Sequence, residues 1–192
     1  CENLPLLLDI PILKKSQVKA SQPLGTGPYV LDTSAEAAVL RKNTNWWCSA
    51  DLAVDADAIA RLAKAGGMRS IVFTSKHHDG FCLWPTETTD YSVKNSPWKD
   101  GQGDVVKELR DACEEYGLEF GVYLSPWDRN AECYGDSPAY NAFFIRQLTE
   151  LLTNYGKVSE VWFDGACAEG PNGKRQVYDW TAILETIHKL QP

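Results

Sequence analysis

The chain has 192 residues, of which 44% are hydrophobic and 23% are charged, so its composition is that of a folded globular protein and not of a disordered segment. Its formal net charge of -7 argues against a nucleic acid as partner, because binding to a polyanion normally needs a basic surface. No apolar run approaches the length of about 18 residues that spans a membrane, so we expect no membrane span.

The N-terminal part of the chain shows little periodicity. Prolines and glycines interrupt most of residues 1–50, although residues 34–41 have the composition of a short helix. No segment in this part has the pattern of a first barrel strand. We therefore expect an irregular N-terminal segment at residues 1–50, followed by a second region at residues 51–192.

From residue 51 onward, helix and strand patterns alternate. Short apolar runs predict strands at residues 70–75, 121–124 and 160–163. Apolar residues spaced three or four apart predict helices at about 54–64, 104–116, 138–155 and 176–190, and the first three helices are each followed by glycine. Asp104 is the predicted N-cap of the second helix. We expect the third helix to bury Phe144, Leu148, Leu151 and Leu152, and the fourth to bury Leu184. This alternation predicts right-handed crossovers and a parallel sheet.

The predicted fold class is α/β, and the pattern is that of a partial (β/α)8 barrel of the TIM type. One strand and helix together take roughly 45 residues, so eight such units would need about 350 residues, more than a barrel of typical size. We therefore expect residues 51–192 to form the first part of a barrel that is incomplete at the C-terminus, where another strand should follow Pro192.

Each predicted strand runs into a cluster of polar and aromatic residues. The clusters occupy residues 76–81, 125–129 and 164–166. Parallel strands would bring all three clusters to the edge where barrels and open α/β sheets carry their chemistry. Two histidines, two carboxylates and tryptophan rings would meet there without a glycine-rich phosphate loop. This combination favours a carbohydrate ligand, because flat aromatic rings stack on sugar faces, although such rings also fill cores.

Asp164 ends the third predicted strand and is followed by Gly165, which leaves backbone room beside its carboxylate. A carboxylate at the mouth of a strand can act as a nucleophile at an anomeric carbon, as in retaining glycosidases. The alternative is a carboxylate that only caps the following loop. Spacing alone leaves both interpretations open.

His77 and His78 are adjacent, so on a regular strand they would point to opposite faces. Beyond the strand end both can line one pocket and hydrogen-bond to hydroxyl groups. A metal site with Asp79 as third ligand and a purely structural pair are the alternatives. The chain offers no complete ligand set, and its six cysteines contain no C-x-x-C motif, so we expect no metal.

Two tryptophans are candidate sugar platforms. Trp127 lies beside Asp128 and Arg129 in the cluster after the second strand, and a rigid loop is the alternative interpretation there. Trp84 follows the first cluster, with loop packing as its alternative. Tyr123, at the end of the second strand, is a further candidate for substrate contact.

Four segments in order resemble the strand-end motifs of the α-L-fucosidases of glycoside hydrolase family twenty-nine. They are KHHDGFCLWP at 76–85, YSVKNSPW at 91–98, YLSPWDR at 123–129 and VWFDGA at 161–166. The resemblance extends over residues 51–192. The sequence of the third segment is similar to that of the branch of the family that acts on α1,3/4-linked fucose.

The resemblance implies a retaining exo-α-L-fucosidase in which Asp164 is the nucleophile. It also implies that His77 and His78 hydrogen-bond to fucose hydroxyls, that Trp127 and Asp128 lie at the pocket wall, and that no cofactor is needed. The implied partner is a fucosylated oligosaccharide or glycoconjugate. A secreted, periplasmic or lysosomal location would suit such a glycan-degrading enzyme.

The chain departs from the family pattern in two places. The family's first strand carries a Phe-Ile-His-Phe-Gly type motif followed by a Glu-Trp pair, and the stretch from Gln22 to Trp47 contains neither. The acid/base glutamate of this branch would lie beyond Pro192. We therefore expect the 192-residue chain not to hydrolyse fucosides alone. A catalytically incomplete or inactive fucose-binding homologue is the first alternative, and a metal-dependent hydrolase is the second.

Overall fold

The computed structural model describes residues 29–32, 39–42 and 55–192, and divides the chain into two units, Cys1–Val54 and Asp55–Pro192. In the first unit, strands β1 (Tyr29–Asp32) and β2 (Val39–Lys42) pair in antiparallel register. The prediction of a helix at residues 34–41 is therefore wrong at residues 39–41, whose backbone pairs with β1 instead. The rest of that predicted helix, and most of the stretch from Gln22 to Trp47, lie outside the described residues.

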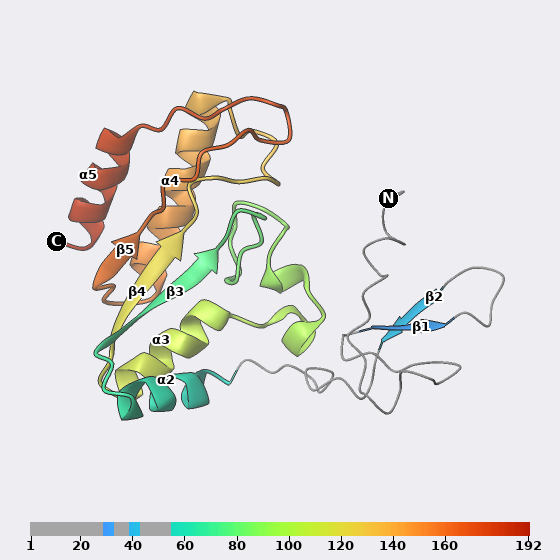
Figure 1. The fold of residues 1–192 in the computed structure, drawn as a ribbon. Helices are drawn as coiled ribbons and strands as arrows, with labels where there is room; N and C mark the ends of the chain where they lie inside the picture. Colours follow the sequence, from blue (N-terminus) through green and yellow to red (C-terminus); the bar gives the residue numbers. More distant parts are fainter. Residues whose placement is uncertain (1–28, 33–38, 43–54) are drawn as a thin grey trace. The chain divides into compact units, whose positions relative to one another are not determined.

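The second unit contains a parallel sheet with strand order β3-β4-β5, in which the three strands lie side by side (Figure 1). The strands are β3 (Ser70–Lys76), β4 (Glu119–Leu124) and β5 (Glu160–Trp162). The helices are α2 (Ala56–Ala65), α3 (Val105–Glu115), α4 (Ser137–Asn154) and α5 (Trp180–Leu190), and two short 3-10 turns, Val93–Asn95 and Trp98–Gly101, follow β3. The predicted α/β alternation and parallel sheet are confirmed, whereas closure into a barrel stays a prediction.

Each of these four helices begins after an aspartate whose carboxylate accepts a backbone N–H of the first turn. The capping residues are Asp55, Asp104, Asp136 and Asp179. Such caps satisfy backbone donors that have no partner within the helix and place a negative charge at the positive end of the helix dipole. The cap at Asp104 is the one that the sequence predicts. The last helix starts later than predicted, at Trp180, because its cap is Asp179.

One face of the sheet carries the hydrophobic core. In β4 the side chains of Phe120, Val122 and Leu124 are buried in a single cluster that includes residues of all four helices. The predicted core of α4 is confirmed, because Phe144, Leu148, Leu151 and Leu152 are all buried. In α5, however, Leu184 is 50% exposed and only its neighbour Ile183 is fully buried, so the predicted packing of Leu184 is wrong.

The opposite face of the sheet is more exposed at its edge strands, where the Thr74 and Trp162 side chains reach solvent. The register aligns Thr74, Tyr123 and Trp162 across the three strands on this face, and the Trp162 side chain is largely exposed. A register shift between Thr74 and Lys76 interrupts the alternation of β3. This bulge turns Lys76 toward the core side, next to Leu124, just before the chain enters the histidine cluster.

Candidate active site

The carboxyl ends of the three strands bring together side chains from β4 and from the loops after β3 and β5. Tyr123, near the end of β4, donates its hydroxyl proton to Oδ2 of Asp164 at 2.7 Å. The Nε2 atom of His78, from the loop after β3, lies 3.6 Å from the same carboxylate oxygen. The parallel register causes this convergence, because all three strands end at one edge of the sheet.

Asp164 is fixed by two hydrogen bonds and still reaches solvent. Its Oδ1 atom accepts the backbone N–H of Ala166 at 3.1 Å, while Oδ2 accepts from Tyr123. Its side chain is 34% exposed. The carboxylate therefore caps its own loop, as one interpretation of the sequence has it, and at the same time is accessible to a ligand.

His78 is packed between two aromatic rings. Its ring centroid lies 3.9 Å from that of His77 and 5.0 Å from that of Trp127, and its side chain is 22% exposed. Burial lowers the pKa of His78 below its usual value of 6.5, and neighbouring His77 lowers it further, although Asp164 acts in the opposite direction. The imidazole is therefore neutral at neutral pH.

Tyr123 is a stable hydrogen-bond donor. Its side chain is buried, and the edge of its ring faces Trp162, with the centroids 6.4 Å apart. Burial, together with its hydrogen bond to Asp164, raises the pKa of Tyr123 to about 12, although the Ser125 hydroxyl acts in the opposite direction. The hydroxyl therefore keeps its proton across the physiological range and orients the carboxylate.

Trp127 forms one side of the same region. Its indole N–H donates to the backbone oxygen of Glu169 at 3.1 Å, which links the loop after β4 to the loop after β5. The guanidinium of Arg129 lies 5.8 Å from the Trp127 ring centroid. These contacts fix the orientation of the ring next to His78.

Asp128, predicted from the sequence as a substrate contact, is instead a buried structural residue. Its side chain is 2% exposed and its Oδ2 atom accepts from Lys76 Nζ at 2.9 Å. Its Oδ1 atom accepts the backbone N–H groups of Asn130 and Ala131. Both oxygens are therefore occupied within the protein, and this arrangement contradicts direct contact with a sugar.

Trp84 is also buried within the protein. It is 1% exposed, and its indole N–H donates to Oε2 of Glu150, on α4, at 2.8 Å. Glu150 also accepts from the Thr86 hydroxyl. Trp84 therefore packs the loop after β3 against α4. This corrects its prediction as a sugar platform and agrees with the alternative interpretation of loop packing.

Sequence reasoning missed two residues next to the site. Ser125 directly follows β4 and is fully buried, with its Oγ atom 2.7 Å from Nδ1 of His78. Lys76 directly precedes the histidine pair, is fully buried and pairs with Asp128. The signal for Ser125 is its place at a strand end beside the histidine cluster, whereas the orientation of Lys76 follows from a bulge that no residue pattern indicates.

Within residues 55–192 and the two described strands before them, no group of three or more His, Cys, Asp or Glu side chains is arranged to hold a metal ion. In the same part of the chain, no helix is long and apolar enough to cross a membrane.

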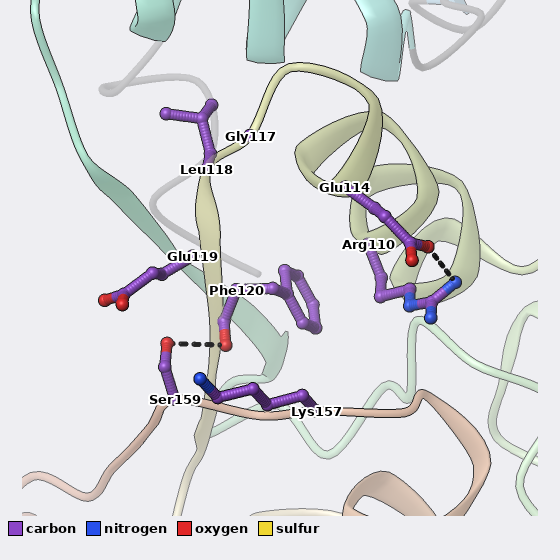
Figure 2. Close-up of a pocket in the computed structure, with 8 residues that line it drawn as sticks. All are labelled: Arg110, Glu114, Gly117, Leu118, Glu119, Phe120, Lys157 and Ser159. Carbon is purple, nitrogen blue, oxygen red and sulfur yellow. Dashed lines mark hydrogen bonds and ion pairs between the residues drawn. The ribbon is translucent and has the colours of Figure 1, made fainter.

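A separate cavity lies at the opposite, N-terminal end of β4 (Figure 2). Its volume is about 300 Å³, and it is lined by Arg110, Glu114, Gly117, Leu118, Glu119, Phe120, Lys157 and Ser159. Arg110 pairs with Glu114 at 2.9 Å, and Ser159 donates to the Phe120 carbonyl at 3.0 Å. The lining includes none of the candidate site residues.

Comparison with known proteins shows which family the chain resembles. Residues 46–192 match the alpha-L-fucosidase family model. Alpha-L-fucosidase 1 of Arabidopsis thaliana is 50% identical over 140 residues, covering 72% of this chain and 27% of the plant protein. Plasma alpha-L-fucosidase of Homo sapiens is 33% identical over 148 residues, covering 72% of this chain and 30% of the human protein.

Solved structures show the same similarity. A glycoside hydrolase 29 family member from an unknown rumen bacterium has 55% identity and a TM-score of 0.67, covering 72% of this chain and 26% of that protein. A Ruminococcus gnavus GH29 fucosidase in complex with fucose has 36% identity and a TM-score of 0.64, covering 71% of this chain and 31% of that protein. The chain spans about a quarter of the length of the first curated relatives it matches. It belongs to the alpha-L-fucosidase family.

Proposed function

We propose that the protein is a retaining exo-α-L-fucosidase that removes terminal α-linked L-fucose, in α1,3/4 linkages, from oligosaccharides or glycoconjugates. The observation that carries this proposal is the Asp164 carboxylate, held by Tyr123 at the carboxyl edge of a parallel sheet with His78 beside it. Membership of the alpha-L-fucosidase family supports the substrate class. A glycan-degrading role would suit a secreted, periplasmic or lysosomal protein.

In the proposed mechanism Asp164 attacks the anomeric carbon of fucose. The bond from that carbon to the leaving oxygen breaks as the bond to the carboxylate forms, and an acid group protonates the leaving oxygen. Water then attacks the same carbon, gives up a proton to the same group acting as base, and releases Asp164. Tyr123 keeps the carboxylate oriented, and His78 accepts a hydrogen bond from a sugar hydroxyl.

A retaining glycosidase needs a second carboxyl group about 5–5.5 Å from the nucleophile. Within residues 55–192, the side chains that hydrogen-bond to or pair with Asp164 are Tyr123 and His78, and neither is a carboxylic acid. We therefore propose that no residue described here is the acid/base, and that the 192-residue polypeptide does not turn over fucosides unaided.

The same observation favours a second candidate, a fucose-binding homologue without catalysis. Two measurements on one preparation separate the candidates: hydrolysis of an aryl α-L-fucoside and calorimetric binding of L-fucose. Both should be made on the 192-residue chain and on any longer form of the protein. Turnover by a longer form supports the fucosidase, whereas fucose binding without turnover in every form supports the second candidate. Turnover by the 192-residue chain alone would contradict the proposed need for a further residue.

A further inference from the structure

The Ser125 hydroxyl has one proton and two hydrogen-bond partners at 2.7 Å. Its Oγ atom lies 2.7 Å from the backbone oxygen of Trp127 and 2.7 Å from Nδ1 of His78. A carbonyl oxygen can only accept a hydrogen bond, so the Ser125 proton is used in the bond to Trp127. The Oγ atom is fully buried with its residue, where an unmade hydrogen bond would be costly.

This arrangement decides which ring nitrogen of His78 carries a proton. Because Ser125 has no second proton to donate, Nδ1 of His78 must be the donor in their contact. A neutral imidazole has a single N–H, so Nε2 carries a lone pair. The Nε2 atom faces Oδ2 of Asp164, another acceptor, at 3.6 Å. Two acceptors thus border one site, which suits a ligand group that donates, such as a hydroxyl.

The opposite tautomer would change the chemistry of the site. With the proton on Nε2, His78 would donate to the Asp164 carboxylate and draw electron density from the nucleophile. It would also lose its capacity to accept from a substrate hydroxyl. Fixing a tautomer through the nitrogen that does not face the substrate is how second partners of functional histidines generally act.

We propose that Ser125 is a positioning residue that holds His78 in its Nδ1–H tautomer and so presents Nε2 to the substrate as a hydrogen-bond acceptor beside Asp164. The tautomer itself does not depend on the activity, whereas its kinetic consequence rests on the proposed fucosidase function. Ser125 acts through His78 and the backbone of Trp127, without touching the substrate.

The direct test is heteronuclear NMR of the His78 ring nitrogens at neutral pH. We expect a protonated Nδ1 and a bare Nε2 in the unsubstituted protein and in Ser125→Thr, which keeps the hydroxyl, and loss of this preference in Ser125→Ala. Ser75→Ala is the matched control, because Ser75 is also fully buried and its hydroxyl also contacts a backbone oxygen, that of Phe73. A proton on Nε2 in the unsubstituted protein, or an unchanged tautomer in Ser125→Ala, would overturn the proposal.

The kinetic test uses an aryl α-L-fucoside and whichever form of the protein hydrolyses it. We expect Ser125→Ala to lower kcat/KM by about 10- to 100-fold, the usual effect of losing such a second partner, with partial recovery in Ser125→Thr and little change in Ser75→Ala. Turnover without any effect of Ser125→Ala would overturn the inference while leaving the fucosidase assignment intact. If no form turns over, the proposed function fails and the NMR result still decides the inference. If Ser125→Ala does not fold, the His78 tautomer of the unsubstituted protein decides the inference.

Discussion

The Nζ atom of Lys76 lies 2.9 Å from Oδ2 of Asp128, and both side chains are closed off from solvent. Lys76 also donates to Oε1 of Gln147, on α4, at 2.9 Å, and aromatic rings of the same helix lie within 6 Å of its charge. This buried pair joins the end of β3 to the loop after β4. Those two segments carry His78 and Trp127, so the pair helps to hold these two site residues in place.

Replacing one member of this pair should be more damaging than replacing both. Lys76→Met leaves the Asp128 charge buried without its partner, and we expect the free energy of unfolding to fall by about 3–5 kcal/mol. The double variant Lys76→Met/Asp128→Leu should recover part of that loss, because it buries no unpaired charge. Urea denaturation measures both. A loss of under about 1 kcal/mol in Lys76→Met would contradict this role.

Tyr123→Phe removes the hydrogen bond to Asp164 and leaves the aromatic packing in place. A hydrogen bond to a charged group contributes about 1.5–3 kcal/mol, so we expect turnover of an aryl α-L-fucoside to slow by roughly 10- to 150-fold. Tyr155→Phe is the matched control, because Tyr155 also donates to a carboxylate, that of the helix cap Asp104, at 2.9 Å. The control should lower stability and leave turnover nearly unchanged. Equal effects of the two variants on turnover would show that Tyr123 has no special part in the reaction.

His78→Ala should weaken the binding of L-fucose by about 1–3 kcal/mol, because it leaves a sugar hydroxyl without its acceptor in a partly buried site. His188→Ala, at the exposed end of α5, is the control and should bind as the unsubstituted protein does. Calorimetry measures both affinities. Unchanged binding in His78→Ala would exclude this histidine from the sugar site.

The lowered pKa of His78 sets the sign of a pH effect. The unfolded chain takes up a proton near pH 6.5, whereas folded His78 does so only at lower pH, because burial and the proximity of His77 and Arg129 outweigh the attraction of Asp164 and Asp79. Its contribution to stability is therefore complete above pH 6.5 and is lost as the pH falls through the folded pKa. An NMR titration of His78 should give a pKa below 6.5, and a value above 6.5 would contradict this environment.

Most of the second unit could be predicted because its signals are local. Apolar periodicity and the glycines that follow three of the helices indicate the helices. Parallel strands must end at one edge, which is why Asp164 and His78 meet. The burial of Asp128 and its pairing with Lys76 depend on a bulge that turns Lys76 inward, and no residue pattern indicates that bulge. Trp84 is closed off by Glu150, 66 residues away in the sequence, so its burial depends on tertiary packing.

The sequence also did not predict the exposure of Leu184 or the strand β2. Leu184 has the spacing of a core residue, but its neighbour Ile183 is the residue of α5 that is buried in the core. The strand at Val39–Lys42 replaces a predicted helix because antiparallel pairing with β1, the preceding strand, satisfies its backbone and overrides a weak local preference.

The central claim is that Asp164 is the nucleophile, and azide rescue of Asp164→Ala tests it most directly. We expect Asp164→Ala to lose several orders of magnitude in turnover of an aryl α-L-fucoside, because the covalent intermediate needs this carboxylate. Glu169→Ala, which removes an exposed carboxylate of the same loop, should keep its activity. Added azide should restore turnover in Asp164→Ala and yield fucosyl azide of inverted configuration. An Asp164→Ala protein that keeps more than about a tenth of its activity, without azide and with retained configuration, would contradict the assignment.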